Sequence, residues 1–172
     1  MATSVSRARA IIGMDVAQAV SGDLGSAEDR ILIAGGATYT DGTGTGNINA
    51  AWSDAARALA DGADETLNLT NASLTDKVGR TVDFSAIKAL YIKNNFAAGN
   101  LVIGAAAATP VAMFGTPATE TLLLGPGAEI EITWAGSGLT VSTNGSLKIA
   151  HDGSGSAAGS YDIAVLGVGA YT

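Results

Sequence analysis

Short segments in which apolar and polar residues alternate make up most of this chain, and each segment ends at a turn signal. In residues 65–70, Leu67 and Leu69 alternate with polar residues. The same alternation returns in residues 129–134 and 146–150. A period of two places one side of a strand against a core and the other side in solvent. These segments therefore predict half-buried β-strands.

Two longer segments, residues 83–93 and 161–168, are apolar on both sides. The first also fits a short helix, with Phe84, Ile87 and Leu90 on one stripe. Its β-branched and aromatic residues, followed by an asparagine pair, favour a strand. Both segments are predicted to be central strands of a sheet.

Further strands are predicted at residues 30–34, 100–105, 111–114 and 119–124, whereas residues 51–60 fit a helix and a strand equally well. Turn signals such as Gly125-Pro126-Gly127 separate the segments. Nine or ten short strands with frequent turns are typical of a sandwich or barrel. We expect an all-β fold, a sandwich or a barrel.

The composition is typical of a scaffold. Only 15% of the 172 residues are charged, 23 are glycine, and the net charge is -7. An acidic chain repels phosphate backbones and anionic lipid head groups, so we expect neither nucleic acid nor membrane as a partner. Cysteine is absent, which excludes disulfides, thiolate metal sites and cysteine nucleophiles.

Two segments were considered as targeting or membrane signals. The apolar run at residues 10–14 is too short for a secretory signal and is followed by Asp15. The charge-free stretch at residues 94–119 contains asparagines, glycines and two prolines, which leave no run of about 20 apolar residues for a spanning helix. The chain is therefore expected to have no signal peptide and to be soluble.

Catalytic residues are hard to assign. His151 is the one histidine, and its place between a predicted strand and a glycine-rich loop indicates an exposed strand end. Glu129 and Glu131 are two residues apart on one strand, so they are predicted to share a solvated face rather than to oppose each other across a cleft. We expect no enzyme and no cofactor.

The glycine-rich segment at residues 41–47 (DGTGTGN) resembles a calcium loop only in having oxygen ligands at alternate positions. One aspartate among neutral threonines favours a hairpin tip, although cation binding stays open. The phosphate-loop pattern is absent, because no lysine precedes Lys77.

The first 29 residues lack a clear period and contain a possible hinge at residues 22–25. They are predicted to form an attachment arm, residues 1–29, with little structure of its own, before a sandwich domain at residues 30–172. The alternative is an extra strand or short helix of the same core. Six residues are the candidate partner contacts of the arm: Arg7, Arg9, Ile11, Ile12, Met14 and Val16.

The apolar run at residues 101–113 (LVIGAAAATPVAM) has two interpretations. Subunit interfaces are depleted in charge and resemble a core cut in half. A buried pair of strands explains the same run equally well.

Several blocks resemble, in order, a widespread group of small virion proteins of tailed bacteriophages. These blocks are residues 41–44 (DGTG), 65–70, 84–94 (FSAIKALYIKN), 125–127 (GPG) and 161–167 (YDIAVLG). The resemblance covers residues 41–168. It implies a β-sandwich or jelly-roll module that is attached to the particle and has no catalytic role. It leaves open whether the module sits on the head or on the tail.

From the resemblance we expect a capsid decoration protein, made in the host cytoplasm and bound to the outer surface of the head. Its partners would be the major capsid protein and its own copies, as a trimer. The alternative is an adhesin or glycan-binding module that stacks sugars on Tyr39, Trp52, Trp134 or Tyr161, and an enzyme such as a depolymerase ranks third.

Overall fold

The computed structural model describes residues 8–22, 25–71, 73–76, 79–104, 111, 113, 120–134, 136–143, 145–154 and 157–172, which contain strands and turns and no helix. In chain order the strands are β1 (Ala8–Gly22), β2 (Gly25–Asp41), β3 (Asn47–Ile48), β4 (Ala50–Leu59), β5 (Asp64–Asn68), β6 (Leu74–Thr75), β7 (Thr81–Asn94), β8 (Leu101–Gly104), β9 (Thr121–Leu124), β10 (Glu129–Thr133), β11 (Leu139–Thr140), β12 (Ser146–His151) and β13 (Gly159–Tyr171). The predicted all-β class is confirmed.

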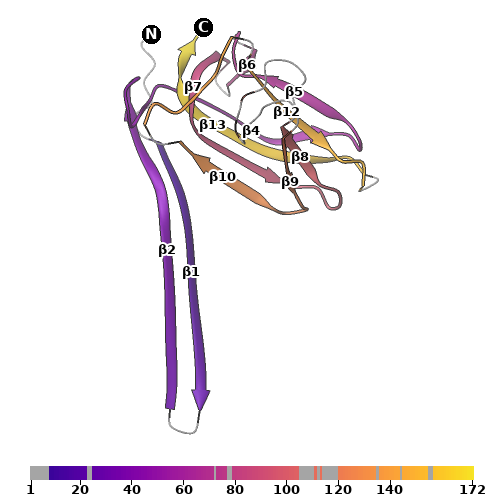
Figure 1. The fold of residues 1–172 in the computed structure, drawn as a ribbon. Coiled ribbons are helices and arrows are strands. Elements are labelled where there is room, and N and C mark those ends of the chain that lie inside the picture. Colours follow the sequence, from indigo (N-terminus) through magenta and orange to yellow (C-terminus); the bar gives the residue numbers. More distant parts are fainter. Residues whose placement is uncertain are drawn as a thin grey trace.

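Two antiparallel sheets form the body of the molecule (Figure 1). The first has the order β10-β7-β13-β4, with β6 and β11 also paired to β7. The second has the order β5-β12-β8-β9. Strands β7 and β13 lie in the middle of the first sheet, so the prediction of two central strands is confirmed.

One apolar core joins the two sheets. Phe84 and Val165 enter it from the first sheet, and Leu67, Ile103 and Ile149 enter it from the second. The alternation predicted for β5 and β12 appears as burial, since Leu67, Leu147 and Ile149 are buried while Lys148 between them is not. Face-to-face packing of two sheets gives the body a sandwich-like arrangement.

Residues 51–60, which fitted a helix and a strand equally, lie almost entirely in β4. Their pairing with β13 decides the conformation, because β4 hydrogen-bonds along it from Ala50 to Leu59. The strand predicted at residues 111–114 is wrong at the two residues described there, since Val111 and Met113 belong to no strand. Leu101 and Ile103 are buried, which favours the buried-strand interpretation for the start of the apolar run at 101–113. Residues 105–110 and 112 lie outside the described part.

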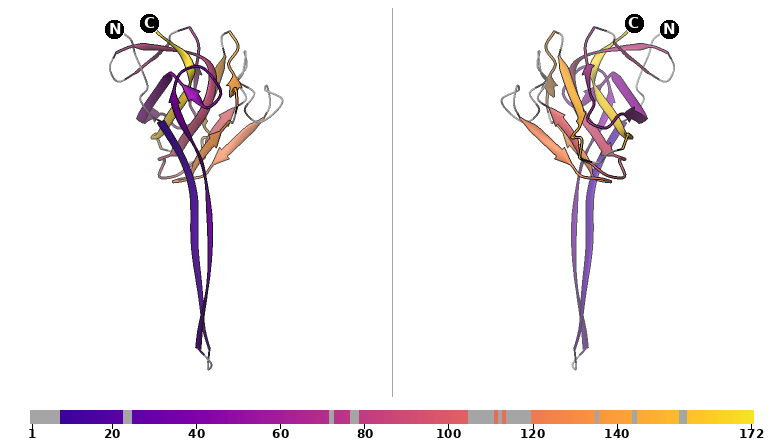
Figure 2. Two further views of the ribbon diagram at one scale, coloured as in Figure 1. Left: turned by 90° about the vertical axis from the view of Figure 1, so that its left-hand side faces the viewer. Right: turned by 90° about the vertical axis from the view of Figure 1, so that its right-hand side faces the viewer.

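Strands β1 and β2 form a two-stranded antiparallel ribbon, paired from Ala8↔Tyr39 to Gly22↔Gly25. Figures 1 and 2 show it extending from one end of the body. The prediction that residues 1–29 have little structure of their own is therefore wrong for residues 8–22 and 25–29. The predicted boundary at residue 29 falls inside β2, and the strand predicted from residue 30 begins at Gly25.

A buried asparagine fixes the turn after β7. Asn94 is fully buried, its Nδ2 donates to the carbonyl oxygens of Leu124 (2.8 Å) and Gly99 (3.2 Å), and its Oδ1 accepts from the Phe96 N–H at 2.8 Å. Asn94→Ala is expected to lower the free energy of unfolding by about 3 kcal/mol, because buried backbone groups lose their partners. Urea unfolding measures the change. The exposed neighbour supplies the control, Asn95→Ala, and equal losses in both variants would contradict the assigned role.

Candidate functional site

The ribbon is the feature that stands apart from the body. Fifteen residue pairs join β1 to β2, and at about 3.3 Å per residue the ribbon is about 50 Å long. An isolated two-stranded ribbon is marginally stable in water. A ribbon of this length therefore needs a surface to pack against.

The ladder register assigns the ribbon residues to two faces, because paired residues and every second pair share a face. One face, which we call the apolar face, carries one charged residue, Asp29. Its pairs are Ile12↔Gly35, Met14↔Ile33, Val16↔Ile31, Gln18↔Asp29 and Val20↔Ala27, continued toward the body by Ala10↔Ala37 and Ala8↔Tyr39. The opposite face carries two positive and two negative residues: Arg9, Asp15, Glu28 and Arg30.

The candidate contact residues divide between these faces. Ile12, Met14 and Val16 belong to the apolar face, whereas Arg9 and Ile11 belong to the opposite one. Arg7 lies outside the described residues. The predicted contact residues do not include the half of the apolar face that β2 supplies, Ile31 and Ile33. Ile31 and Ile33 lie in the strand predicted at residues 30–34, and the glycines at positions 22 and 25 were the available signal for a tight turn that pairs this strand with the preceding segment.

The ribbon is attached to the body through its root, which we define as the buried residues Tyr39 and Ile48 with their contacts. They pack on Ala89 of β7, and Ala37 and Leu166 complete the cluster. The Tyr39 hydroxyl donates a 2.9 Å hydrogen bond to the carbonyl oxygen of Lys88. Burial, and secondarily the charge of Glu131, raises the pKa of Tyr39 above its ordinary value of 10.0.

Tyr39→Phe removes this hydrogen bond and is expected to lower the free energy of unfolding by about 1 kcal/mol. The folded state holds the proton more tightly than the unfolded chain, so the stabilisation is present below pH 10.0 and is lost as the pH rises through the raised pKa. Urea unfolding of both proteins at several pH values measures it. A difference that stays constant above pH 10.0 would contradict the role of the hydroxyl.

A cavity of about 260 Å³ lies beside the root. Tyr39 and Trp134 line it together with three threonines, Thr38, Thr45 and Thr133, and glycines 36, 46 and 136. Next to it, Nζ of the buried Lys88 donates to the carbonyl oxygen of Gly136. The cavity thus combines an aromatic surface with hydroxyl groups.

The four aromatic residues considered for glycan stacking do not form one surface. Tyr39 and Trp52 are each 3% exposed and Tyr161 is fully buried, while Trp134 is half-buried. The Tyr161 hydroxyl donates to Glu65 at 2.6 Å inside a network in which Glu65 also binds Arg57. The structure brings together Tyr39 and Trp134, and leaves Trp52 and Tyr161 in the core.

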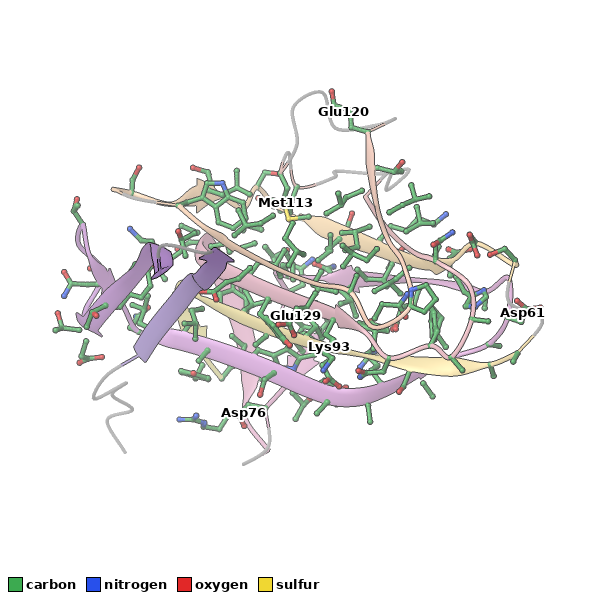
Figure 3. All side chains as sticks on the ribbon, turned by 90° about the horizontal axis from the view of Figure 1, so that it is seen from below. Asp61, Asp76, Lys93, Met113, Glu120 and Glu129 are labelled. Atoms are coloured by element: carbon green, nitrogen blue, oxygen red, sulfur yellow. The ribbon has the colours of Figure 1, made fainter. Side chains whose placement is uncertain are left out.

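His151 is buried, so its predicted exposed position is wrong, although it does end β12. Asp61 lies 3.1 Å from its Nδ1, which accepts the Gly153 N–H, and the Phe96 ring packs on the imidazole at 4.5 Å. Figure 3 shows Asp61 at the end of the body opposite the ribbon. Among the described residues Nε2 has no hydrogen-bond partner, and its burial keeps a substrate from reaching it.

Glu129 and Glu131 share one face of β10, as predicted, but their surroundings differ. Glu129 is exposed and accepts a 2.8 Å hydrogen bond from the Tyr91 hydroxyl. Burial is the larger cause and the hydrogen bond to Glu129 the second, and together they raise the pKa of the Tyr91 hydroxyl to about 12. Glu131 is half-buried, and burial raises its pKa, so the prediction of a solvated pair is wrong for this residue.

Residues 41–47 form a loop rather than the predicted hairpin tip, because β2 and β3 pair in parallel. Asn47 closes the loop by donating from Nδ2 to Thr40 Oγ1 at 2.8 Å and to the Asp41 carbonyl oxygen at 3.0 Å. Within the described part of the chain, no three His, Asp or Glu residues are grouped as metal ligands.

Among the described residues no helix is long and apolar enough to cross a membrane. The candidate sites are the apolar face, the root with its cavity, and a second cavity of about 400 Å³ lined by Trp52, Asp76 and Arg80 among others. Comparison with known proteins adds no relative to this picture: the chain matches no family model, no curated protein and no solved structure.

Proposed function

We propose that the protein is a structural protein of a tailed bacteriophage particle, a decoration protein on the outer surface of the head. The observation that carries the proposal is the ribbon of about 50 Å joined to a sandwich-like body. A body that stays on the surface while an arm reaches a neighbour is suited to linking subunits. The same assignment is suggested by the order of the blocks at residues 41–168, which resembles that of small virion proteins.

The pairing of the eight principal strands supports a jelly roll. Numbered in chain order, β4, β5, β7, β8, β9, β10, β12 and β13 pair as first with eighth, second with seventh, third with sixth and fourth with fifth. This is the pairing of one long antiparallel hairpin. Contacts of β13 with β7 and of β12 with β8 roll that hairpin into two sheets. Jelly rolls are common in viral capsid and lectin domains, although a fold alone does not determine a function.

The mechanism follows from linkage. A protein that binds only the assembled shell stabilises the shell by the free energy of its binding. The net charge of -7 is compatible with an outer position, where affinity for the packaged DNA would be a disadvantage. The proposed partners are the major capsid protein and further copies of this chain, as a trimer.

The test uses heads that lack the protein because its gene has been deleted from the phage. Purified protein is added back, and binding is measured by co-sedimentation while a DNA-binding dye reports rupture on heating. We expect saturable binding to the heads and a higher rupture temperature. Heads that bind no protein would contradict the proposal.

The root cavity favours one alternative, a module that binds glycans. The half-buried Trp134 offers a stacking surface, and three threonines offer hydroxyl partners, in a cavity of about 260 Å³. Isothermal titration calorimetry with free oligosaccharides of the host envelope tests it. Binding that disappears in Trp134→Ala and persists in Trp52→Phe would support a glycan site.

A further inference from the structure

We propose that the apolar face of the ribbon packs against the same face of the ribbons in the other copies of this chain. This inference specifies the interface of the oligomer included in the proposed function. It concerns the purified protein alone, so its test is independent of any phage particle.

The first argument is continuity at the root. Ala37 and Tyr39 belong to the apolar face, and both pack on the body, against Ala89 and Leu166. Farther along the ribbon the same face continues through Ile12, Met14, Val16, Ile31 and Ile33, where the body no longer accompanies it (Figure 1). Among the described side chains of this face, Ala37 and Tyr39 are the ones that pack on the body.

The second argument is charge. Asp29 is the one charged residue of the apolar face, whereas the opposite face carries balanced charges. A face depleted in charge resembles the permanent interfaces between subunits. A partner met only on the assembled shell would leave a marginally stable ribbon without support until then. Another copy is present from the moment of synthesis.

The third argument is area. Beyond the root, the eleven pairs from Ile12↔Gly35 to Gly22↔Gly25 span about 36 Å. A ribbon about 10 Å wide then offers about 360 Å² on this face, so three ribbons that meet on it bury about 1,100 Å², which reaches the lower limit for a specific interface. The described surface of the body offers few large apolar residues that could form an alternative interface. Among residues whose side chains the structure describes, Leu123 is the large apolar residue that is exposed, at 57%.

The test compares lysine substitutions on the two faces of the ribbon. Val16→Lys and Ile33→Lys alter the apolar face, whereas Ala17→Lys and Ala34→Lys alter the opposite face one residue away. A further control, Leu123→Lys, alters the exposed residue of the body. Sedimentation velocity at about 20 μM gives the mass, and tryptophan fluorescence monitors the fold, since Trp52 and Trp134 both belong to the body.

We expect the wild type and all three controls to be oligomeric and both apolar-face variants to be monomeric with unchanged fluorescence. A monomeric wild type would overturn the proposal, as would dissociation by Leu123→Lys or oligomers that persist in Val16→Lys and Ile33→Lys.

A second measurement does not require a disruptive variant. The chain has no cysteine, so Val16→Cys and Ala17→Cys each introduce one thiol. We expect a maleimide to label Val16→Cys at least tenfold more slowly than Ala17→Cys in the oligomer, and equally fast once urea has unfolded both. Equal rates in the native proteins would overturn the packing of this face.

Discussion

Deletion of residues 2–35 is expected to leave a folded body that neither associates nor binds phage heads. The apolar core has no member before Ala50 among the described residues, and Tyr39 and Ile48 of the root remain in the truncated chain. The melting temperature should therefore stay within about 4 °C of the wild type, the shift that about 1 kcal/mol produces at this size. Calorimetry and co-sedimentation with heads give the two results.

The deletion separates two structural roles of the ribbon. A truncated protein that unfolds would show that the ribbon belongs to the folding unit, as in the alternative of an extra core strand. A truncated protein that still binds heads with unchanged affinity would place the particle contact on the body. The control is Ala17→Lys, which alters the opposite face of the ribbon and should keep both the oligomer and the binding.

Gly167→Ala is expected to cost about 3 kcal/mol of the free energy of unfolding, a large effect for one added carbon. Gly167 is buried in the central strand β13, where the pairing with β7 shifts register. A Cβ at this position would overlap the carbonyl oxygen of Ala86 and come within 3.0 Å of the Phe84 ring. A backbone oxygen in a paired strand cannot move without disturbing the sheet.

Urea unfolding measures the loss, and Ala170→Val is the matched control. Ala170 is exposed on the same strand, so its larger substitution should change stability by no more than about 0.5 kcal/mol. Equal effects of the two substitutions would contradict the close approach of β13 and β7 at this glycine.

The sequence predicts strands well where alternation and burial coincide. Leu67 and Leu69, like Leu147 and Ile149, alternate in the sequence and are buried in the structure, since one side of each strand faces the core. Alternation was less informative for β4, where alanines suit both a helix and a strand. There the partner strand β13, distant in the sequence, determines the conformation.

His151 shows why local signals failed for the site. A glycine-rich loop after a strand suggests exposure, but Asp61, Gly62 and Phe96 contact the imidazole. No pattern around position 151 encodes that contact. The ribbon was not predicted for another reason. Its two strands show their common apolar face only once the register pairs Met14 with Ile33 and Val16 with Ile31.

A cryo-EM map of the intact phage particle tests the central claim most directly. The proposed function predicts density for the body on the outer surface of the head, between neighbouring capsid subunits, with ribbons of adjacent copies meeting along their apolar faces. Density for this chain confined to the tail, or a particle that lacks the chain, would contradict it.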